Sequence, residues 1–105
     1  MSGISTHVLD TAMGRPAAGI PVRLYREGEE LASALTNADG RVPALLPKDT
    51  SLATGKYRIT FDVGACWSES FYPEVSVTFW VKDIESHYHI PLLMSPFGFT
   101  TYRGS

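Results

Sequence analysis

The sequence predicts an all-β domain, a sandwich of two sheets with about eight short strands. Three observations support this fold class. Apolar and polar residues alternate in several runs of five to seven residues, as in half-buried strands. Clusters of Gly, Pro, Asn and Asp separate the runs at regular spacing, which is typical of antiparallel sandwiches. At 105 residues, with 44% hydrophobic and 19% charged residues, the chain 1–105 forms one globular domain without room for a second core.

The N-terminal third is predicted to hold three strands. Residues 4–10 form the first, and the polar segment around Gly14-Arg15-Pro16 is expected to be a turn. Residues 21–26 and 31–36 are predicted to pair as a hairpin across Glu27-Gly28-Glu29.

A turn and two further strands follow. Asn37-Ala38-Asp39-Gly40 has turn chemistry, because Asx side chains cap such bends and glycine accepts positive φ. A short strand then carries Arg41 and Val42. Residues 56–62 alternate cleanly and place Tyr57, Ile59 and Phe61 on one face.

The C-terminal part is predicted to add one helical turn and three strands. Residues 63–70 lack alternation and can hold a single helical turn, whereas residues 75–81 have a wholly apolar face. The last strands are expected at residues 88–93 and 98–102. Prolines suit strand ends and loops, where no ladder donor is lost. The prolines expected in such places are Pro43, Pro47, Pro73, Pro91 and Pro96.

Composition excludes several functional classes. A net charge of −2 gives no reason to expect nucleic acid or an anionic membrane as a partner. The apolar runs are shorter than the about 20 residues that span a bilayer, and residues 1–4 lack the basic start and apolar stretch of a signal peptide. The single cysteine, Cys66, rules out an internal disulfide and is expected to be a small buried hydrophobe. A cytoplasmic location is predicted.

Strand parity indicates where the histidines point. In the first strand Ile4 and Val8 share one face, so His7 lies on the other. By the same argument His89 lies opposite Tyr88, Ile90 and Leu92. If the apolar faces form the core, both imidazoles point outward. Functional groups that point outward on a small domain suggest that a second subunit covers them, and the outward Trp80 is interpreted in the same way.

Three ordered segments resemble one family. These are Ser5-Thr6-His7-Val8-Leu9-Asp10-Thr11, then His87-Tyr88-His89-Ile90-Pro91-Leu92-Leu93, and finally Tyr102-Arg103-Gly104-Ser105. Together they resemble the 5-hydroxyisourate hydrolases, the transthyretin-like enzymes of urate breakdown. The resemblance covers essentially the whole chain. It implies a transthyretin-like sandwich of eight strands and one short helix, and a homotetramer, a dimer of dimers with sites at the dimer–dimer interface.

The resemblance also implies site residues and a reaction. It assigns His7, Arg41 and His89 as catalytic residues, and Tyr102, Arg103, Gly104 and Ser105 as the wall that fixes the substrate. The expected reaction is hydrolysis of 5-hydroxyisourate to 2-oxo-4-hydroxy-4-carboxy-5-ureidoimidazoline, without a cofactor. One of the two histidines would deprotonate the attacking water and arginine would stabilise the intermediate; which histidine does so stays open.

The sequence leaves three other functional interpretations open. A transthyretin-type carrier of a small aromatic ligand would share the fold, although such a carrier has no need of the histidines and the Tyr-Arg-Gly-Ser segment. A purely structural sandwich module would leave the outward histidines unexplained. His87, two residues from His89, also invites a zinc site with His7 as third ligand, but no carboxylate or cysteine completes it by spacing, and the family uses no metal.

Overall fold

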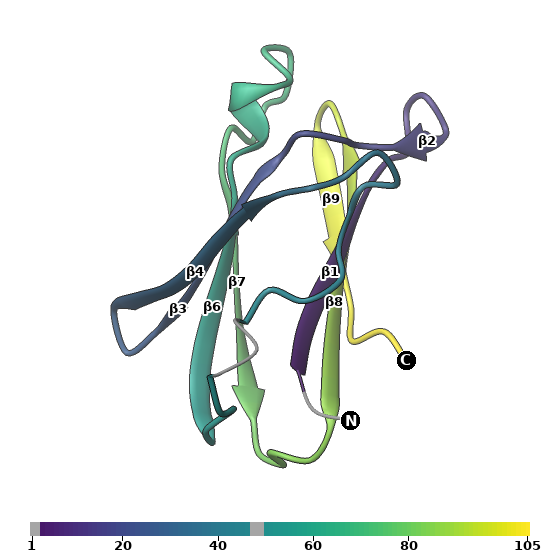
Figure 1. Cartoon of the computed structure of the whole chain (residues 1–105). Coiled ribbons are helices and arrows are strands. Elements are labelled where there is room, and N and C mark those ends of the chain that lie inside the picture. The colour runs from purple at the N-terminus through teal and green to yellow at the C-terminus, as the bar shows by residue number, and fades with distance from the viewer. Residues whose placement is uncertain (1–2, 47–49) are drawn as a thin grey trace.

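The computed structural model describes residues 3–46 and 50–105, which form nine strands and one short 3₁₀ helix in two sheets (Figure 1). The elements are β1 (Gly3–Asp10), β2 (Arg15–Pro16), β3 (Pro21–Arg26), β4 (Glu29–Leu35), β5 (Arg41–Val42), β6 (Gly55–Phe61), η1 (Val63–Ala65), β7 (Val75–Val81), β8 (His87–Ser95) and β9 (Gly98–Thr101). The predicted all-β sandwich is therefore confirmed. No helix in these two ranges is long and apolar enough to cross a membrane.

The two sheets have different topologies. The five-stranded sheet runs β2-β1-β8-β9, and β5 pairs with the same edge of β1 as β2 does. The four-stranded sheet runs β4-β3-β6-β7, with all pairs antiparallel. Within the first sheet β1 and β8 are parallel, which joins the beginning of the chain to its C-terminal part. Figure 1 shows the C-terminal end of the chain beside this sheet.

Alternate side chains of the strands fill the core between the sheets, as their period-two pattern predicted. Burial of these faces on folding is the main force that holds the sandwich together, because each sheet covers the apolar face of the other. Fully buried residues from both sheets meet there: Ile4, Val8, Val22, Leu24, Tyr57, Ile59, Phe61, Val75, Val81, Leu92 and Met94.

Two expectations about the backbone were wrong. Arg15 and Pro16 form the short strand β2 against Asp10 and Leu9, although their composition indicated only a turn. Pro91 lies inside β8 rather than at its end. The carbonyl of His89 accepts a hydrogen bond from the tail, and the carbonyl of Pro91 accepts one from the Thr101 side chain in β9. Regular pairing of β8 with β9 starts only at Leu92, so the N–H that Pro91 lacks would face a position outside that pairing.

Cys66 was also predicted wrongly. The residue follows η1 and is exposed, and its Sγ lies 3.2 Å from the carbonyl oxygen of Gly19. The local reason is that η1 packs Val63 into the core, while Ala65 and Cys66 lie at the surface.

The β3–β4 turn offers a stability prediction. Glu27 has φ 52° and Gly28 has φ 83°, which is the two-residue turn geometry that favours Asn-Gly. Glu27→Asn is expected to stabilise the fold by roughly 0.5 kcal/mol, since a left-handed backbone costs most L-residues about 1–2 kcal/mol and asparagine less. Urea unfolding measures the change, and Glu27→Gln, which removes only the charge, should leave the free energy of unfolding unchanged. Equal midpoints for all three proteins would contradict this explanation.

Candidate active site

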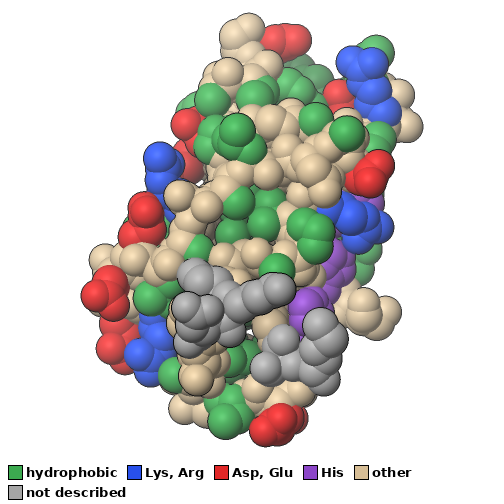
Figure 2. Space-filling model, viewed as in Figure 1, with side chains coloured by type: hydrophobic (Ala, Val, Ile, Leu, Met, Phe, Trp, Pro, Cys, Tyr) green, Lys and Arg blue, Asp and Glu red, His purple; other side chains and the backbone are tan. Residues whose placement is uncertain are grey.

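The parallel pairing of β1 and β8 gathers polar side chains on the outer face of the five-stranded sheet. The register places Ser5 opposite His89 and His7 opposite Pro91. Because side chains alternate, Ser5, His7, His87 and His89 all project away from the core. Both predicted histidines are half-buried, which confirms the orientation deduced from parity. In Figure 2 the histidines lie on the side of the molecule that this sheet forms.

The turn after β4 brings Arg41 to the same face. The Asn37 side-chain oxygen accepts hydrogen bonds from the backbone N–H groups of Asp39 (2.9 Å) and Arg41 (3.0 Å), so the asparagine holds the bend. The strand that follows pairs antiparallel with β1 and sets Arg41 opposite His7. A guanidinium is thereby placed beside an imidazole through backbone pairing alone.

The C-terminal tail returns to the site after β9. The N–H of Gly104 donates a hydrogen bond of 2.8 Å to the carbonyl of His89, which extends the sheet by an isolated bridge. Ser105 then lines a cavity of about 280 Å³ on the outer face. The other lining residues are Ser5, Thr6, Arg41, Pro43, His87 and His89. The volume is near the lower end of small-molecule sites, about 300–1,000 Å³.

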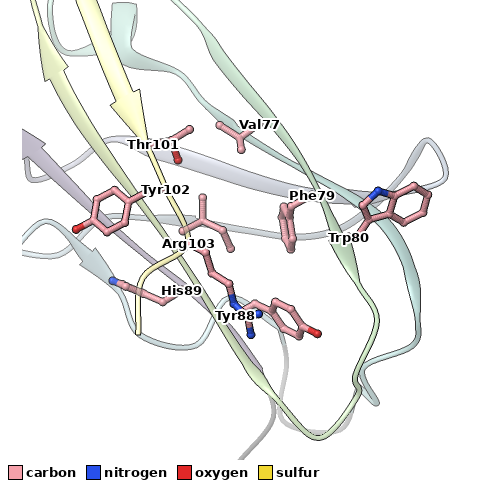
Figure 3. A pocket seen from close by; sticks show the side chains of 9 residues that line it. Val77, Phe79, Trp80, Tyr88, His89, Thr101, Tyr102 and Arg103 are labelled. Carbon is pink, nitrogen blue, oxygen red and sulfur yellow. The ribbon is translucent and has the colours of Figure 1, made fainter.

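Tyr102 and Arg103 lie outside this cavity. The Arg103 guanidinium stacks on the Tyr88 ring, 4.5 Å from its centroid, and Tyr102 is 57% exposed. Both line a separate pocket of about 200 Å³ between the edge strands β7 and β9 (Figure 3). His89 lines both cavities. One chain therefore brings Arg41, His89 and Ser105 together at the cavity, and His7 lies opposite Arg41. The side chains of Tyr102 and Arg103 are not part of this group.

Trp80 belongs to the other sheet but lines a pocket together with His89. It lies on β7 in the four-stranded sheet, is 59% exposed, and has the Lys56 ammonium 5.6 Å from its ring centroid. Together with His89, Trp80 lines the pocket of about 200 Å³ that also holds Tyr102 and Arg103 (Figure 3). That a second subunit covers Trp80 stays a prediction.

Ser5 and His87 were not predicted as site residues. The Ser5 hydroxyl lies 2.7 Å from Nε2 of His87 and 2.8 Å from Nδ1 of His89. The available signal was the spacing of two residues that separates Ser5 from His7 and His87 from His89. Within residues 3–46 and 50–105, no group of three His, Cys, Asp or Glu side chains is arranged to hold a metal ion.

The electrostatics of the site favour neutral imidazoles. Burial lowers the pKa of His89 most, and the neighbouring Arg41, His7 and His87 lower it further, against a smaller opposing effect of a hydrogen bond to the backbone of Ser5. Burial and Arg41 likewise lower the pKa of His7, while contacts with Asp39 raise it. A histidine with a pKa below 6.5 is unprotonated at neutral pH, so either ring can accept a proton there.

Comparison with known proteins agrees with the resemblance found in the sequence. Residues 4–104 match the HIUase/Transthyretin family. The 5-hydroxyisourate hydrolase of Caulobacter vibrioides is 44% identical, with 100% of both chains covered. The structure of Klebsiella pneumoniae 5-hydroxyisourate hydrolase superposes with a TM-score of 0.90 at 39% identity and covers all of both chains. Sea bream transthyretin in complex with thyroxine superposes with a TM-score of 0.85 at 27% identity, over 96% of this chain and 93% of that one. The chain belongs to the HIUase/Transthyretin family.

Proposed function

We propose that the chain hydrolyses 5-hydroxyisourate to 2-oxo-4-hydroxy-4-carboxy-5-ureidoimidazoline, a step of urate breakdown. The observation that carries the proposal is the convergence of His7, Arg41 and His89 on one face of the five-stranded sheet, where Arg41 and His89 line a small cavity. The full-length relatives named 5-hydroxyisourate hydrolase support the same reaction.

The proposed mechanism uses only side chains of this site. A neutral histidine accepts a proton from water, and the water oxygen attacks a carbonyl carbon of the six-membered ring. Arg41 stabilises the oxyanion that develops on the carbonyl oxygen, after which the C–N bond breaks and the leaving nitrogen takes up a proton. General base catalysis contributes about 10²–10⁴-fold in rate. An oxyanion donor contributes about 10²–10³-fold.

The tail residues Tyr102, Arg103, Gly104 and Ser105 form the substrate-binding wall in this proposal. Ser105 lines the cavity of its own chain, whereas Tyr102 and Arg103 lie at the β7–β9 edge. We therefore propose a homotetramer, a dimer of dimers with sites at the dimer–dimer interface, in which neighbouring chains complete each site. Light scattering coupled to size exclusion tests this arrangement, since a monomer would contradict it.

A carrier function is the competing proposal, because the thyroxine complex of sea bream transthyretin shares the fold. The polar character of the outer face favours the hydrolase. Two imidazoles and a guanidinium are better suited to proton transfer and oxyanion binding than to the binding of an apolar ligand. For localisation we propose the cytoplasm, because Cys66 is the single cysteine and no disulfide can form within the chain.

The direct test follows the ultraviolet absorbance of 5-hydroxyisourate, freshly made from urate by urate oxidase. The proposal expects the protein to accelerate its decay well beyond the spontaneous rate and to give the ring-opened product. Decay at the spontaneous rate in the presence of folded protein would contradict the hydrolase. Thyroxine binding by the same preparation would then favour the carrier.

The lowered pKa values predict a specific pH dependence. The acidic limb of kcat/KM is expected to have its midpoint below pH 6.5, because the base works only when its imidazole is neutral and burial and Arg41 both lower its pKa. Arg41→Gln should lower the rate and also move this midpoint to higher pH. Arg23→Gln on the four-stranded sheet is the control and should leave the profile unchanged. A wild-type midpoint above pH 6.5 would contradict the electrostatic explanation.

A further inference from the structure

A continuous chain of hydrogen-bonding groups joins three side chains that line the cavity, from the half-buried His89 to the exposed His87. Nδ1 of His89 lies 2.8 Å from the Ser5 hydroxyl, which in turn lies 2.7 Å from Nε2 of His87. Ser5 is 7% exposed, whereas His87 is exposed at the start of β8. The backbone fixes the three groups, because Ser5 pairs with His89 across β1 and β8, and His87 lies two residues earlier on the same face.

We propose that Ser5 and His87 are positioning residues for His89: they hold its neutral ring in the Nδ1–H tautomer and carry that proton toward solvent when Nε2 accepts one from water. The inference rests on the proposed function and deepens it, since it selects His89 over His7 as the base and names the groups that prepare it.

Proton counting supports this assignment. A serine hydroxyl has one proton and two lone pairs, so it can donate to at most one of the two ring nitrogens and can accept from one or both. If His89 donates from Nδ1, Nε2 of His89 keeps its lone pair, and Ser5 is free to donate its own proton to Nε2 of His87. The reverse arrangement would protonate Nε2 of His89 and leave no base on that ring. A His89 ring that deprotonates water at Nε2 must therefore donate from Nδ1, and the relay further requires Ser5 to donate to Nε2 of His87.

The same chain balances the charge of the reaction. When Nε2 of His89 takes a proton from water, its Nδ1 proton passes to Ser5 Oγ, and the hydroxyl proton of Ser5 passes to Nε2 of His87. His89 is then neutral with a proton on Nε2, and His87 carries the positive charge. The Nε2 proton is available for the leaving nitrogen, and return of a proton through Ser5 restores the initial state.

The charges around His89 disfavour a cation on its ring. Arg41 from β5 and His7 from β1 both disfavour a cation on His89. Arg103 also approaches His87: its Nη2 lies 3.5 Å from the carbonyl oxygen of His87, and its guanidinium stacks on Tyr88. Burial also disfavours an imidazolium on the half-buried His89, whereas the His87 side chain is exposed to solvent.

The tautomer can be tested independently of catalysis. Long-range ¹H–¹⁵N spectra of the full-length protein distinguish Nδ1–H from Nε2–H imidazoles. The neutral His89 ring is expected to be Nδ1–H in the wild type and to shift toward Nε2–H in Ser5→Ala. Ser95→Ala is the matched control, because Ser95 lies at the other end of β8 and its hydroxyl donates to Gly98. A wild-type Nε2–H ring, or a ring insensitive to Ser5→Ala, would overturn the proposal.

Kinetics of His87→Ala test the relay without disturbing the core, because His87 is exposed. We expect kcat to fall about 10–100-fold with KM within about threefold, a smaller loss than the about 10⁴-fold that a wrong tautomer costs in a serine protease triad. Added imidazole should restore part of the rate in His87→Ala but not in Ser5→Ala. Unchanged kcat in His87→Ala would overturn the relay. If the wild type did not hydrolyse 5-hydroxyisourate but its His89 ring was Nδ1–H, only the proposed function would be refuted.

Discussion

His89→Gln is expected to lower kcat for 5-hydroxyisourate about 10²–10⁴-fold, the range for loss of a positioned general base. Glutamine keeps the polar character of the half-buried site, but its amide cannot accept a proton near neutral pH. The backbone carbonyl of His89 still accepts the hydrogen bond from Gly104, so the tail keeps its anchor. Initial rates from the ultraviolet assay, with thermal unfolding as a check of folding, measure the effect.

His7→Gln is the comparison that separates the two histidines. His7 also has a lowered pKa, but burial and Arg41 cause it, and its direct partner is the turn at Asp39 rather than the Ser5–His87 chain. We expect a smaller loss of kcat for His7→Gln, and an acidic limb of the pH profile that persists. A loss below tenfold for His89→Gln, together with a larger one for His7→Gln, would transfer the role of base to His7.

Arg41 connects binding with proton transfer. Its charge lowers the pKa of both histidines and so keeps a base available at neutral pH. The same charge stabilises the oxyanion in the proposed mechanism. One residue therefore acts on two steps, which explains why Arg41→Gln is expected to change both the rate and the acidic midpoint.

Most of the fold could be read from alternation alone. The runs with apolar faces became β1, β3, β6, β7 and β8, because burial of one face decides both strand and register. Elements without such a face were missed: β2 has two exposed residues and exists only through pairing with β1. Pro91 was misplaced for a related reason. A proline can lie inside β8 only because the pairing with β9 does not extend to it, and the tertiary structure decides where that pairing ends.

The sequence predicted on which face of the sheet the histidines lie, but not which side chains are their neighbours. Parity alone placed His7 and His89 on the outer face, whereas the parallel register of β1 with β8 decides that Ser5 meets His89. No local pattern reveals that register. The path of the tail was likewise hidden: Gly104 pairs with His89, but Arg103 turns to Tyr88, outside the cavity that the family resemblance led us to expect for it.

Gly104→Ala is expected to lower kcat/KM about 100-fold with little change in thermal stability. A Cβ at this position would lie 2.5 Å from Cδ2 of His89 and 3.3 Å from Cγ of Pro91, closer than side chains normally approach. Either the tail moves and its hydrogen bond to the His89 carbonyl weakens, or the imidazole tilts. A displacement of about 1 Å in a catalytic group can cost 10²-fold, and the tail follows the last strand, so the core between the sheets stays intact.

Gly98→Ala is the matched control for this substitution. Its Cβ would meet nothing closer than the Ser95 hydroxyl at 3.6 Å, an ordinary contact at the start of β9. Activity close to wild type for Gly98→Ala and a large loss for Gly104→Ala would assign the effect to the His89 contact rather than to glycine replacement in general. If Gly104→Ala kept kcat/KM within threefold, the tail would not define the ring position of His89, and its part in the substrate wall would have to be abandoned.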